Sequence, residues 1–283
     1  MGSVRGRAAL VVEGGAMRGV FSAGVLDVFL EQDFDPFDLT IGTSAGACNL
    51  ASHVAKQYGR NQRCYLRLMT QRAFIDPGRL WSRKHVMDLD WLWDELARVE
   101  PLDVAAIVAS GKEFVAVTTS ATTGQPRYLT PDHASMFTAL KGSCALPILY
   151  RGPVSVDGEA VVDGGVSDPI AVAEAYRRGA RRIVVVRSRP ADVVKATGAS
   201  DWIFSLVAGS RALGAAIRGT GAAYRQAVEF MQAPPADCQI IQVAPAAPLP
   251  VDRTTQDLAA LEHTYELGRT LGAAAILDWH ALS

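Results

Sequence analysis

Cysteine, histidine and lysine are scarce in this 283-residue chain, and its formal net charge is only −1. The four cysteines are far apart and show no pair spacing of a metal site or disulfide framework. None of the five histidines lies in a recognisable catalytic triad context. A net charge near zero argues against a nucleic-acid partner held by bulk electrostatics, and we expect none. The cysteines are Cys48, Cys64, Cys144 and Cys238, and the histidines are His53, His85, His133, His263 and His280.

Long apolar runs are missing as well. No apolar stretch approaches the ~20 residues that span a bilayer. The short apolar run near the N-terminus is interrupted by Glu13, so the sequence does not predict a signal peptide. We therefore expect a reduced, cytoplasmic protein, with transient contact at a membrane surface left open.

The composition supports a large buried core, because 49% of the residues are hydrophobic. Strand-like and helix-like segments alternate along the chain. This alternation predicts an α/β fold with three layers, α/β/α, around a mostly parallel central sheet. The predicted strands are 8–13, 38–43, 113–119, 126–130, 153–163, 182–188 and 238–243, and the predicted helices are 19–31, 45–58, 61–71, 89–97, 101–110, 132–141, 169–179, 201–231 and 255–278.

A serine on a sharp turn is the most informative feature. Residues 39–46 read LTIGTSAG, so a short apolar strand leads to Ser44 and a run of small residues follows. Gly42 and Gly46 bracket the serine in the G-x-S-x-G pattern of a nucleophile elbow, a strained strand-to-helix turn that exposes the hydroxyl. The start of the following helix favours developing negative charge. The pattern predicts a nucleophile at Ser44.

A glycine-rich segment, residues 13–19, reads EGGAMRG between an expected strand and an expected helix. Such a turn gathers backbone N–H groups that hold a phosphate or the oxyanion formed when an ester carbonyl is attacked. A dinucleotide loop is the rival interpretation, with Asp33 or Asp35 as its acidic residue. However, Ala16 replaces a glycine of the G-x-G-x-x-G fingerprint, and a nucleotide role leaves Ser44 without a function.

Two Asp-Gly pairs occur close together later in the chain. Asp157-Gly158 separates two short apolar segments and predicts a hairpin turn. Asp163, followed by Gly164 and Gly165, stands at the end of the second segment, where a carboxylate can project into a site.

These three segments, in this order, resemble the patatin-like phospholipase family. The family pattern is a glycine-rich oxyanion loop, then G-x-S-x-G, then D-G-[GA], and it matches residues 14–19, 42–46 and 163–165. The family usually has a central loop glycine where this chain has Ala16, and Asp where it has Glu13. The resemblance covers about the first two-thirds of the chain.

The resemblance implies a patatin-like arrangement of the α/β/α fold and a serine acyl hydrolase of bacterial patatin type. Residues 7–189 would form the catalytic core, and residues 190–283 a helical and strand extension packed on the same domain. The expected substrates are carboxylic esters of lipids, namely phospholipids, lysophospholipids or acylglycerols, cleaved through an acyl-enzyme. This chemistry needs no metal or organic cofactor.

The implied catalytic pair is Ser44 as nucleophile and Asp163 as general base, without histidine. A free Asp has a pKa near ~3.9, so a dry pocket and a short hydrogen bond must make it an effective acceptor. The implied oxyanion hole comprises Gly14, Gly15, Ala16, Met17, Arg18 and Gly19; Gly42 and Gly46 form the elbow, and Gly164 and Gly165 complete the Asp-Gly-Gly motif.

Several structural alternatives stay open. The Cβ of Ala16 restricts positive φ, so a lipid-binding or regulatory protein with weak or no activity is the second functional hypothesis. Arg18 is either an ion-pair partner or a donor near an anion. We expect His53 to be packed within a helix, and Asp168 to cap the next helix rather than act as a second base.

Residues 80–96 read LWSRKHVMDLDWLWDEL, with more apolar side chains than one helix stripe accommodates. Core or subunit packing of Trp81, Trp91 and Trp93 is the first interpretation. An apolar mouth that admits an acyl chain is the second, because the segment falls between the serine and the aspartate in the chain.

Overall fold

The computed structural model describes residues 6–82, 84–193 and 209–282. Their strands form one sheet in the pairing order β5-β6-β3-β2-β1-β7-β8, with β4 paired to β3. Strands β1, β2, β3, β7 and β8 are parallel, and β4, β5 and β6 pair antiparallel. The bounds are β1 (Arg7–Val12), β2 (Leu39–Thr43), β3 (Glu113–Ser120), β4 (Pro126–Leu129), β5 (Val154–Val156), β6 (Glu159–Asp163), β7 (Ala180–Val186) and β8 (Gln239–Val243).

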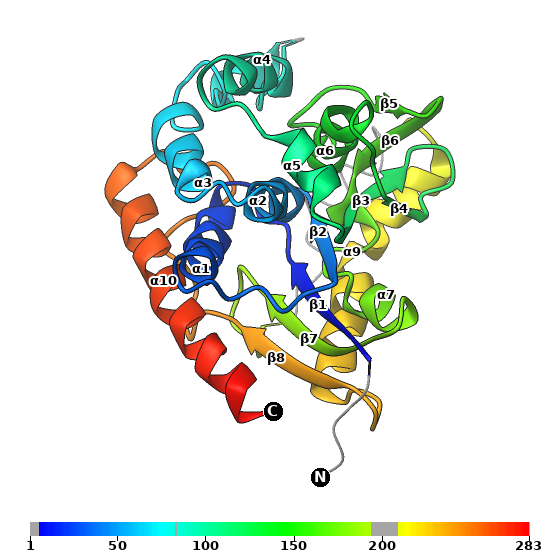
Figure 1. Cartoon of the computed structure of the whole chain (residues 1–283). Helices are drawn as coiled ribbons and strands as arrows, with labels where there is room; N and C mark the ends of the chain where they lie inside the picture. The colour runs from blue at the N-terminus through cyan, green and yellow to red at the C-terminus, as the bar shows by residue number, and fades with distance from the viewer. Residues whose placement is uncertain (1–5, 83, 194–208, 283) are drawn as a thin grey trace.

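Helices cover both faces of this sheet, with α1, α2 and α10 on one side and α7 and α9 on the other (Figure 1). The three-layer α/β/α fold with a mostly parallel sheet is therefore confirmed. The α-helices are α1 (Val20–Glu31), α2 (Ala45–Val54), α3 (Arg60–Arg63), α4 (Leu89–Val99), α5 (Val104–Ala109), α6 (Met136–Cys144), α7 (Val172–Arg177), α9 (Arg211–Gln232) and α10 (Leu258–Ala281); short 3-10 segments are η1 (Ala16–Gly19), η3 (Pro77–Trp81) and η4 (Gly164–Val166), and η2 (Cys64–Leu68) is a π-helix.

Strand β1 shows why the central strands are apolar throughout. Leu10 and Val12 pack into the core that includes α1, α2 and α10, whereas Ala9 and Val11 pack toward α7 and α9. All four side chains are buried. A parallel strand covered on both faces needs hydrophobic residues at every position rather than at alternate ones.

Helices α1 and α10 touch through their backbones. A Cβ placed on Gly268 would lie 2.1 Å from the carbonyl oxygen of Phe21, and one on Gly24 would lie 2.1 Å from that of Tyr265. The Tyr265 hydroxyl donates to a carboxylate oxygen of the buried Asp27 at 2.8 Å. This contact fixes the C-terminal helix on the same face of the sheet as α1.

Some predicted helix ends are wrong. Helix α2 ends at Val54 rather than at residue 58, because Lys56 and Gly59 take left-handed backbone angles (φ 58° and 70°) that end a helix. The helix predicted over 61–71 is α3 followed by the π-helix η2, which ends at Leu68. The first part of the helix predicted over 201–231 lies outside the described residues.

In the part of the chain that the structure describes, none of the helices combines the length and apolarity needed to cross a bilayer.

We expect Gly268→Ala to lower the free energy of unfolding by about 1–3 kcal/mol, because the added methyl group pushes α10 off α1. Gly219→Ala is the matched control, since Gly219 also lies within a helix but has open space around it. That change should stabilise the protein by up to ~1 kcal/mol through helix propensity. Urea denaturation of both variants measures the difference. If both substitutions change the free energy of unfolding equally, the α1–α10 contact can shift to accept a methyl group without cost.

Candidate active site

One edge of β3 brings two distant parts of the sequence together. Strand β2 pairs with residues 113–117 of β3, β4 with residues 116–119, and β6 with residues 118–120. A strand residue has one neighbour on each side, so the overlaps place β4 on one edge and β2 and β6 end to end on the other. Thr43 then faces Val117, and Asp163 faces the next residue, Thr118. The residue after Thr43 is Ser44, which therefore meets Asp163.

The Ser44 backbone is strained. It has φ 55° and ψ −129° between the end of β2 and the start of α2, a region that non-glycine residues rarely adopt. Its N–H donates to Ser143 Oγ at 2.8 Å, and Ser143 Oγ–H donates to the carbonyl oxygen of Val117 at 2.6 Å. Helix α6, which carries Ser143, thus anchors the turn to β3.

The glycines around Ser44 permit close packing. A Cβ on Gly42 would lie 2.4 Å from the Cα of Ala47, and one on Gly46 would lie 2.4 Å from the carbonyl oxygen of Val12. Each position admits only a hydrogen atom, because the first turn of α2 crosses both its own strand and β1. This steric requirement explains why glycines stand two residues before and two residues after Ser44.

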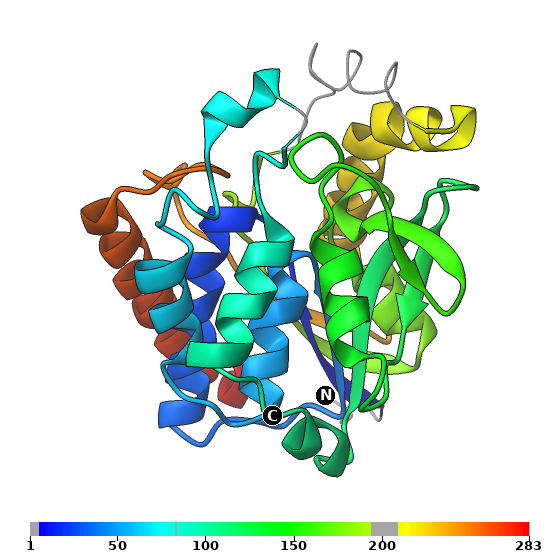
Figure 2. The same ribbon diagram turned by 90° about the horizontal axis from the view of Figure 1, so that it is seen from above.

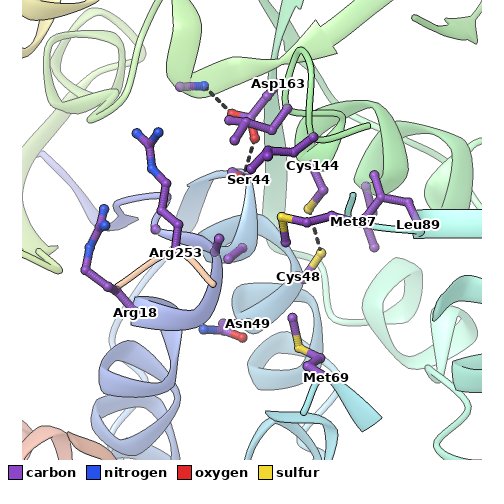
Figure 3. Close-up of a pocket in the computed structure, with 18 of the residues that line it drawn as sticks. Arg18, Ser44, Cys48, Asn49, Met69, Met87, Leu89, Cys144, Asp163 and Arg253 are labelled. Carbon is purple, nitrogen blue, oxygen red and sulfur yellow. Dashed lines mark hydrogen bonds between the residues drawn. The ribbon is translucent and has the colours of Figure 1, made fainter. Parts of the chain in front are cut away.

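Ser44 and Asp163 are hydrogen-bonded to each other. Ser44 Oγ–H donates to Asp163 Oδ2 at 2.7 Å, and the Gly165 N–H donates to Oδ1 at 2.7 Å (Figure 3). The exposed fractions are 8% for Ser44 and 1% for Asp163. The carboxylate is thus oriented by a backbone donor on one oxygen and holds the serine hydroxyl with the other.

The glycine-rich loop lies beside this pair. Gly14, Gly15, Ala16 and Arg18 line the same cavity as Ser44, whereas Met17 and Gly19 are buried. Ala16 has φ 49°, so alanine occupies the left-handed conformation that glycine adopts without strain. The Tyr65 hydroxyl donates to the Ala16 carbonyl oxygen at 3.4 Å.

A buried acid links the loop to the end of β7. The Ser188 N–H donates to Glu13 Oε2 at 2.6 Å, and Arg18 Nε–H donates to Ser188 Oγ at 3.4 Å. Burial raises the pKa of Glu13, and the charge of Arg18 opposes that rise. Arg189 Nε lies 3.9 Å from Glu13 Oε1. The motifs gave no sign of Ser188 or Arg189; the only available signal was that they lie at and directly after the end of the predicted strand 182–188.

The cavity has a volume of about 400 Å³ and a largely apolar wall. Helix α4 supplies much of that wall, so the segment 80–96 lies at the cavity. Its three tryptophans lie in different environments: Trp93 lines the cavity, Trp91 packs against a core cluster, and Trp81 is 92% exposed. The apolar residues that line the cavity from this segment and its surroundings are Met69, Phe74, Met87, Leu89, Leu92, Leu96, Leu102, Leu140, Leu146 and Leu149.

The C-terminal third of the chain also reaches the cavity. Ile217, Thr220 and Tyr224 of α9 line it, together with Arg253 and Thr254 from the segment before α10. Figure 2 shows the yellow N-terminal part of α9 and the orange segment before α10 on opposite sides of the upper part of the molecule. No sequence motif indicated these residues.

Two cysteines meet in the cavity wall. The sulfur atoms of Cys48 and Cys144 are 3.4 Å apart, and both side chains are half-buried rather than fully buried. The contact with Cys48 raises the pKa of Cys144 well above its ordinary value, which keeps this thiol protonated. Among the residues described, no cluster of three His, Cys, Asp or Glu side chains suits a metal ion.

Other candidate residues lie away from this pair. His53 is buried in α2, and its Nε2 is 3.8 Å from Asp35 Oδ1. Asp35 precedes β2, at the opposite end of the parallel strands from Gly14, so it does not complete a dinucleotide site. Asp168 accepts a hydrogen bond from the Tyr128 hydroxyl at 2.8 Å rather than meeting Ser44.

Comparison with known proteins gives matches to family models, to a curated protein and to a solved structure. The family model "Patatin-like phospholipase" matches residues 10–176, and "Domain of unknown function (DUF6363)" matches residues 211–282. The uncharacterized protein YjjU of Escherichia coli (strain K12) is 36% identical over 278 residues, covering 94% of this chain and 76% of that protein. The crystal structure of VipD from Legionella pneumophila aligns over 95% of this chain and 67% of that one, with 13% identity and a TM-score of 0.41.

The family match places this chain in a family of lipid hydrolases, and its three-layer sheet fits the fold of that family. Within that class, the chain belongs to the patatin-like phospholipase family, because the family model covers more than half of it. The resemblance found in the sequence motifs is thereby confirmed.

Asp168 gives this region a measurable pH dependence. Burial raises its pKa to about 6 from an ordinary 3.8, so the folded state holds a proton that the unfolded state releases. Stability must then fall as pH rises between these two values. We expect Asp168→Asn, which mimics the protonated acid, to gain about 2 kcal/mol in free energy of unfolding relative to wild type between about pH 4.5 and pH 7.

Chemical denaturation at the two pH values measures this gain. Tyr128→Phe is the companion variant, because the Tyr128 hydrogen bond lowers the pKa of Asp168. Its stability should fall more steeply with pH than that of wild type. A constant difference between Asp168→Asn and wild type would contradict the raised pKa.

Proposed function

We propose that this protein is a serine acyl hydrolase that cleaves carboxylic ester bonds of lipids through a Ser44–Asp163 dyad. The observation that carries the proposal is the 2.7 Å hydrogen bond from Ser44 Oγ to Asp163 Oδ2 inside a cavity with an apolar wall. The strained backbone of Ser44 supports its role as the residue of a nucleophile elbow. Membership of the patatin-like phospholipase family supports a lipid substrate.

In the proposed reaction, the Ser44 hydroxyl proton moves to Asp163 as Oγ attacks the ester carbonyl carbon. The tetrahedral intermediate collapses, and the leaving alcohol takes the proton back from Asp163. Water then attacks the acyl-enzyme, again giving its proton to Asp163, and the fatty acid leaves as Ser44 is regenerated. The Gly165 N–H keeps the carboxylate oriented through both steps.

The oxyanion needs donors on the opposite side of the carbonyl carbon. We assign this role to the N–H groups of Gly15 and Ala16, in the loop beside Ser44. One such donor typically contributes ~3 kcal/mol to the transition state. A dyad without an imidazole depends strongly on this contribution, because aspartate is a weak base.

We also propose that the two parts of the chain act together, with residues 7–189 carrying the reacting groups and residues 190–283 completing the cavity. Tyr224 and Arg253 support this division, since both lie in the cavity wall beyond the catalytic core. A soluble ester or a lipid at a membrane surface could reach Ser44 through the same cavity.

The dyad is tested by substitution. Asp163→Asn keeps the shape of the side chain but removes the proton acceptor, so we expect kcat on a short acyl ester to fall by ~10²-fold or more. Ser44→Ala should abolish turnover and labelling by a fluorophosphonate, which intact mass detects. Asp157→Asn is the matched control, because Asp157 also precedes a glycine but lies in the exposed β5–β6 turn. Turnover above a tenth of wild type in Asp163→Asn, with the melting temperature unchanged, would contradict the base assignment.

Ala16→Gly tests the loop. Glycine adopts this positive φ without a Cβ that restrains the loop, so its N–H groups can approach the oxyanion more closely in the transition state; a gain of about 1 kcal/mol there raises kcat about fivefold with KM nearly unchanged. Asp33→Gly relieves a similar strain (φ 50°) far from Ser44 and should leave kcat as it is. If Ala16→Gly also leaves kcat unchanged, the loop already places its N–H groups correctly with alanine at position 16. Absence of both turnover and labelling in wild type would instead favour the lipid-binding alternative.

A further inference from the structure

Four arginines line the cavity; Arg60 donates to the Ser52 hydroxyl and the Glu100 carbonyl oxygen, and the other three lie together. Figure 3 shows Arg18 and Arg253 extending together on one side of Ser44, with Met87 and Leu89 on the other. Arg189 also lines the cavity and lies near Glu13, which places it beside Arg18. We call the group formed by Arg18, Arg189 and Arg253 the basic end.

Positive charge exceeds negative charge at the basic end. Among the described residues that line the cavity, the carboxylates are those of Glu13 and Asp163, and Asp163 is hydrogen-bonded to Ser44. Three guanidinium groups therefore face one acid, Glu13. The acid next to Arg253, Asp252, accepts hydrogen bonds from Thr254 and Thr255 in its own turn.

The three arginines are close enough to repel one another. Burial, and next the charge of Arg189, lower the pKa of Arg18 to about 10, and Arg253 adds to this effect. Arg18 is nevertheless charged at neutral pH. The three arginine side chains are only partly buried, so water screens part of their mutual repulsion. An anion at this end would offset the rest, and a guanidinium group can bind two phosphate oxygens at once.

We propose that the basic end binds the phosphate of the substrate's head group, and that the preferred substrate is an acylglycerol carrying a phosphomonoester. This inference rests on the proposed function, because the ester must reach Ser44 with its acyl chain against Met87 and Leu89. The phosphate then lies on the opposite side of Ser44, next to the arginines.

The charge count selects the monoester. A phosphomonoester carries about −1.5 to −2 at neutral pH, which matches the excess of two positive charges. A phosphocholine diester carries one negative charge and brings an ammonium group that the arginines repel. A neutral acylglycerol offers the guanidinium groups no charge at all.

The test compares three esters with one acyl chain, each below its critical micelle concentration: acylglycerol phosphate, acylglycerophosphocholine and monoacylglycerol. We expect kcat/KM to decrease in that order. We expect Arg189→Gln and Arg253→Gln each to reduce the ratio of kcat/KM for the phosphate ester over the neutral ester by about tenfold. Arg225→Gln removes the same charge from the exposed face of α9 and should leave the ratio unchanged.

The pH dependence gives a second readout. The second phosphate pKa is ~6, so the same ratio should rise between about pH 5 and pH 7 in wild type and flatten in Arg253→Gln. The ratio cancels any titration of the catalytic groups, which both substrates share. Inorganic phosphate distinguishes a head-group site from a site for the free ion. Under our proposal it competes with acylglycerol phosphate.

Equal kcat/KM for the phosphate and neutral esters in wild type would overturn the proposal. So would inhibition of all three esters by inorganic phosphate without a head-group preference, which would indicate a site for the free ion. A uniform loss on all esters in Arg189→Gln and Arg253→Gln would show a structural role instead. Fluorophosphonate labelling of Ser44, measured in parallel, separates these results from failure of the hydrolase proposal itself.

Discussion

The shared edge of β3 is the constraint on which the candidate site depends. Because β2 and β6 follow each other along this edge, Thr43 and Asp163 stand opposite consecutive residues of one strand. A one-residue slip of either strand would turn its side chains to the other face of the sheet and separate Ser44 from Asp163. Ser143 reinforces the same register, since its hydroxyl joins the Ser44 N–H to the Val117 carbonyl oxygen. The precision of the serine–carboxylate contact thus comes from backbone pairing rather than from the two side chains.

The layered fold and the pairing of Ser44 with Asp163 could be predicted from the sequence, but few of the residues around that pair could. Strands such as β1 are short apolar runs bounded by turn residues, and their alternation with helices is a local signal. Ser44 and Asp163 each follow such a strand within a glycine pattern that steric contact imposes. Ser143 and Arg253 carry no local pattern, because their positions depend on how α6 and the segment before α10 pack. The predicted end of α2 was wrong for a similar reason, because Lys56 has a positive φ and lysine is not a residue type that predicts one.

Electrostatics and shape divide the cavity on either side of Ser44. Helix α4 contributes apolar side chains to the wall, whereas the loop after β1 and the end of β7 contribute charged groups. Burial raises the pKa of Glu13 in that loop, and the charge of Arg18 opposes the rise. Glu13 holds the loop to Ser188 and moderates the charge of Arg18 at the same time. Glu13 therefore both fixes the position of the glycine-rich loop and offsets part of the positive charge of Arg18. A change at Glu13 would affect the loop beside Ser44 and the charge of the cavity together.

The wall formed by α9 and the segment before α10 has an evolutionary consequence. Tyr224 and Arg253 reach the cavity from a part of the chain that contributes no residue to the edge of β3. Substitutions in that part can reshape the space beside Ser44 without disturbing the strand registers that hold the serine and the aspartate together. Relatives that keep the same serine–aspartate contact are thus free to diverge in the shape of the adjoining cavity through their C-terminal third, whereas loss of that third would open the cavity to water.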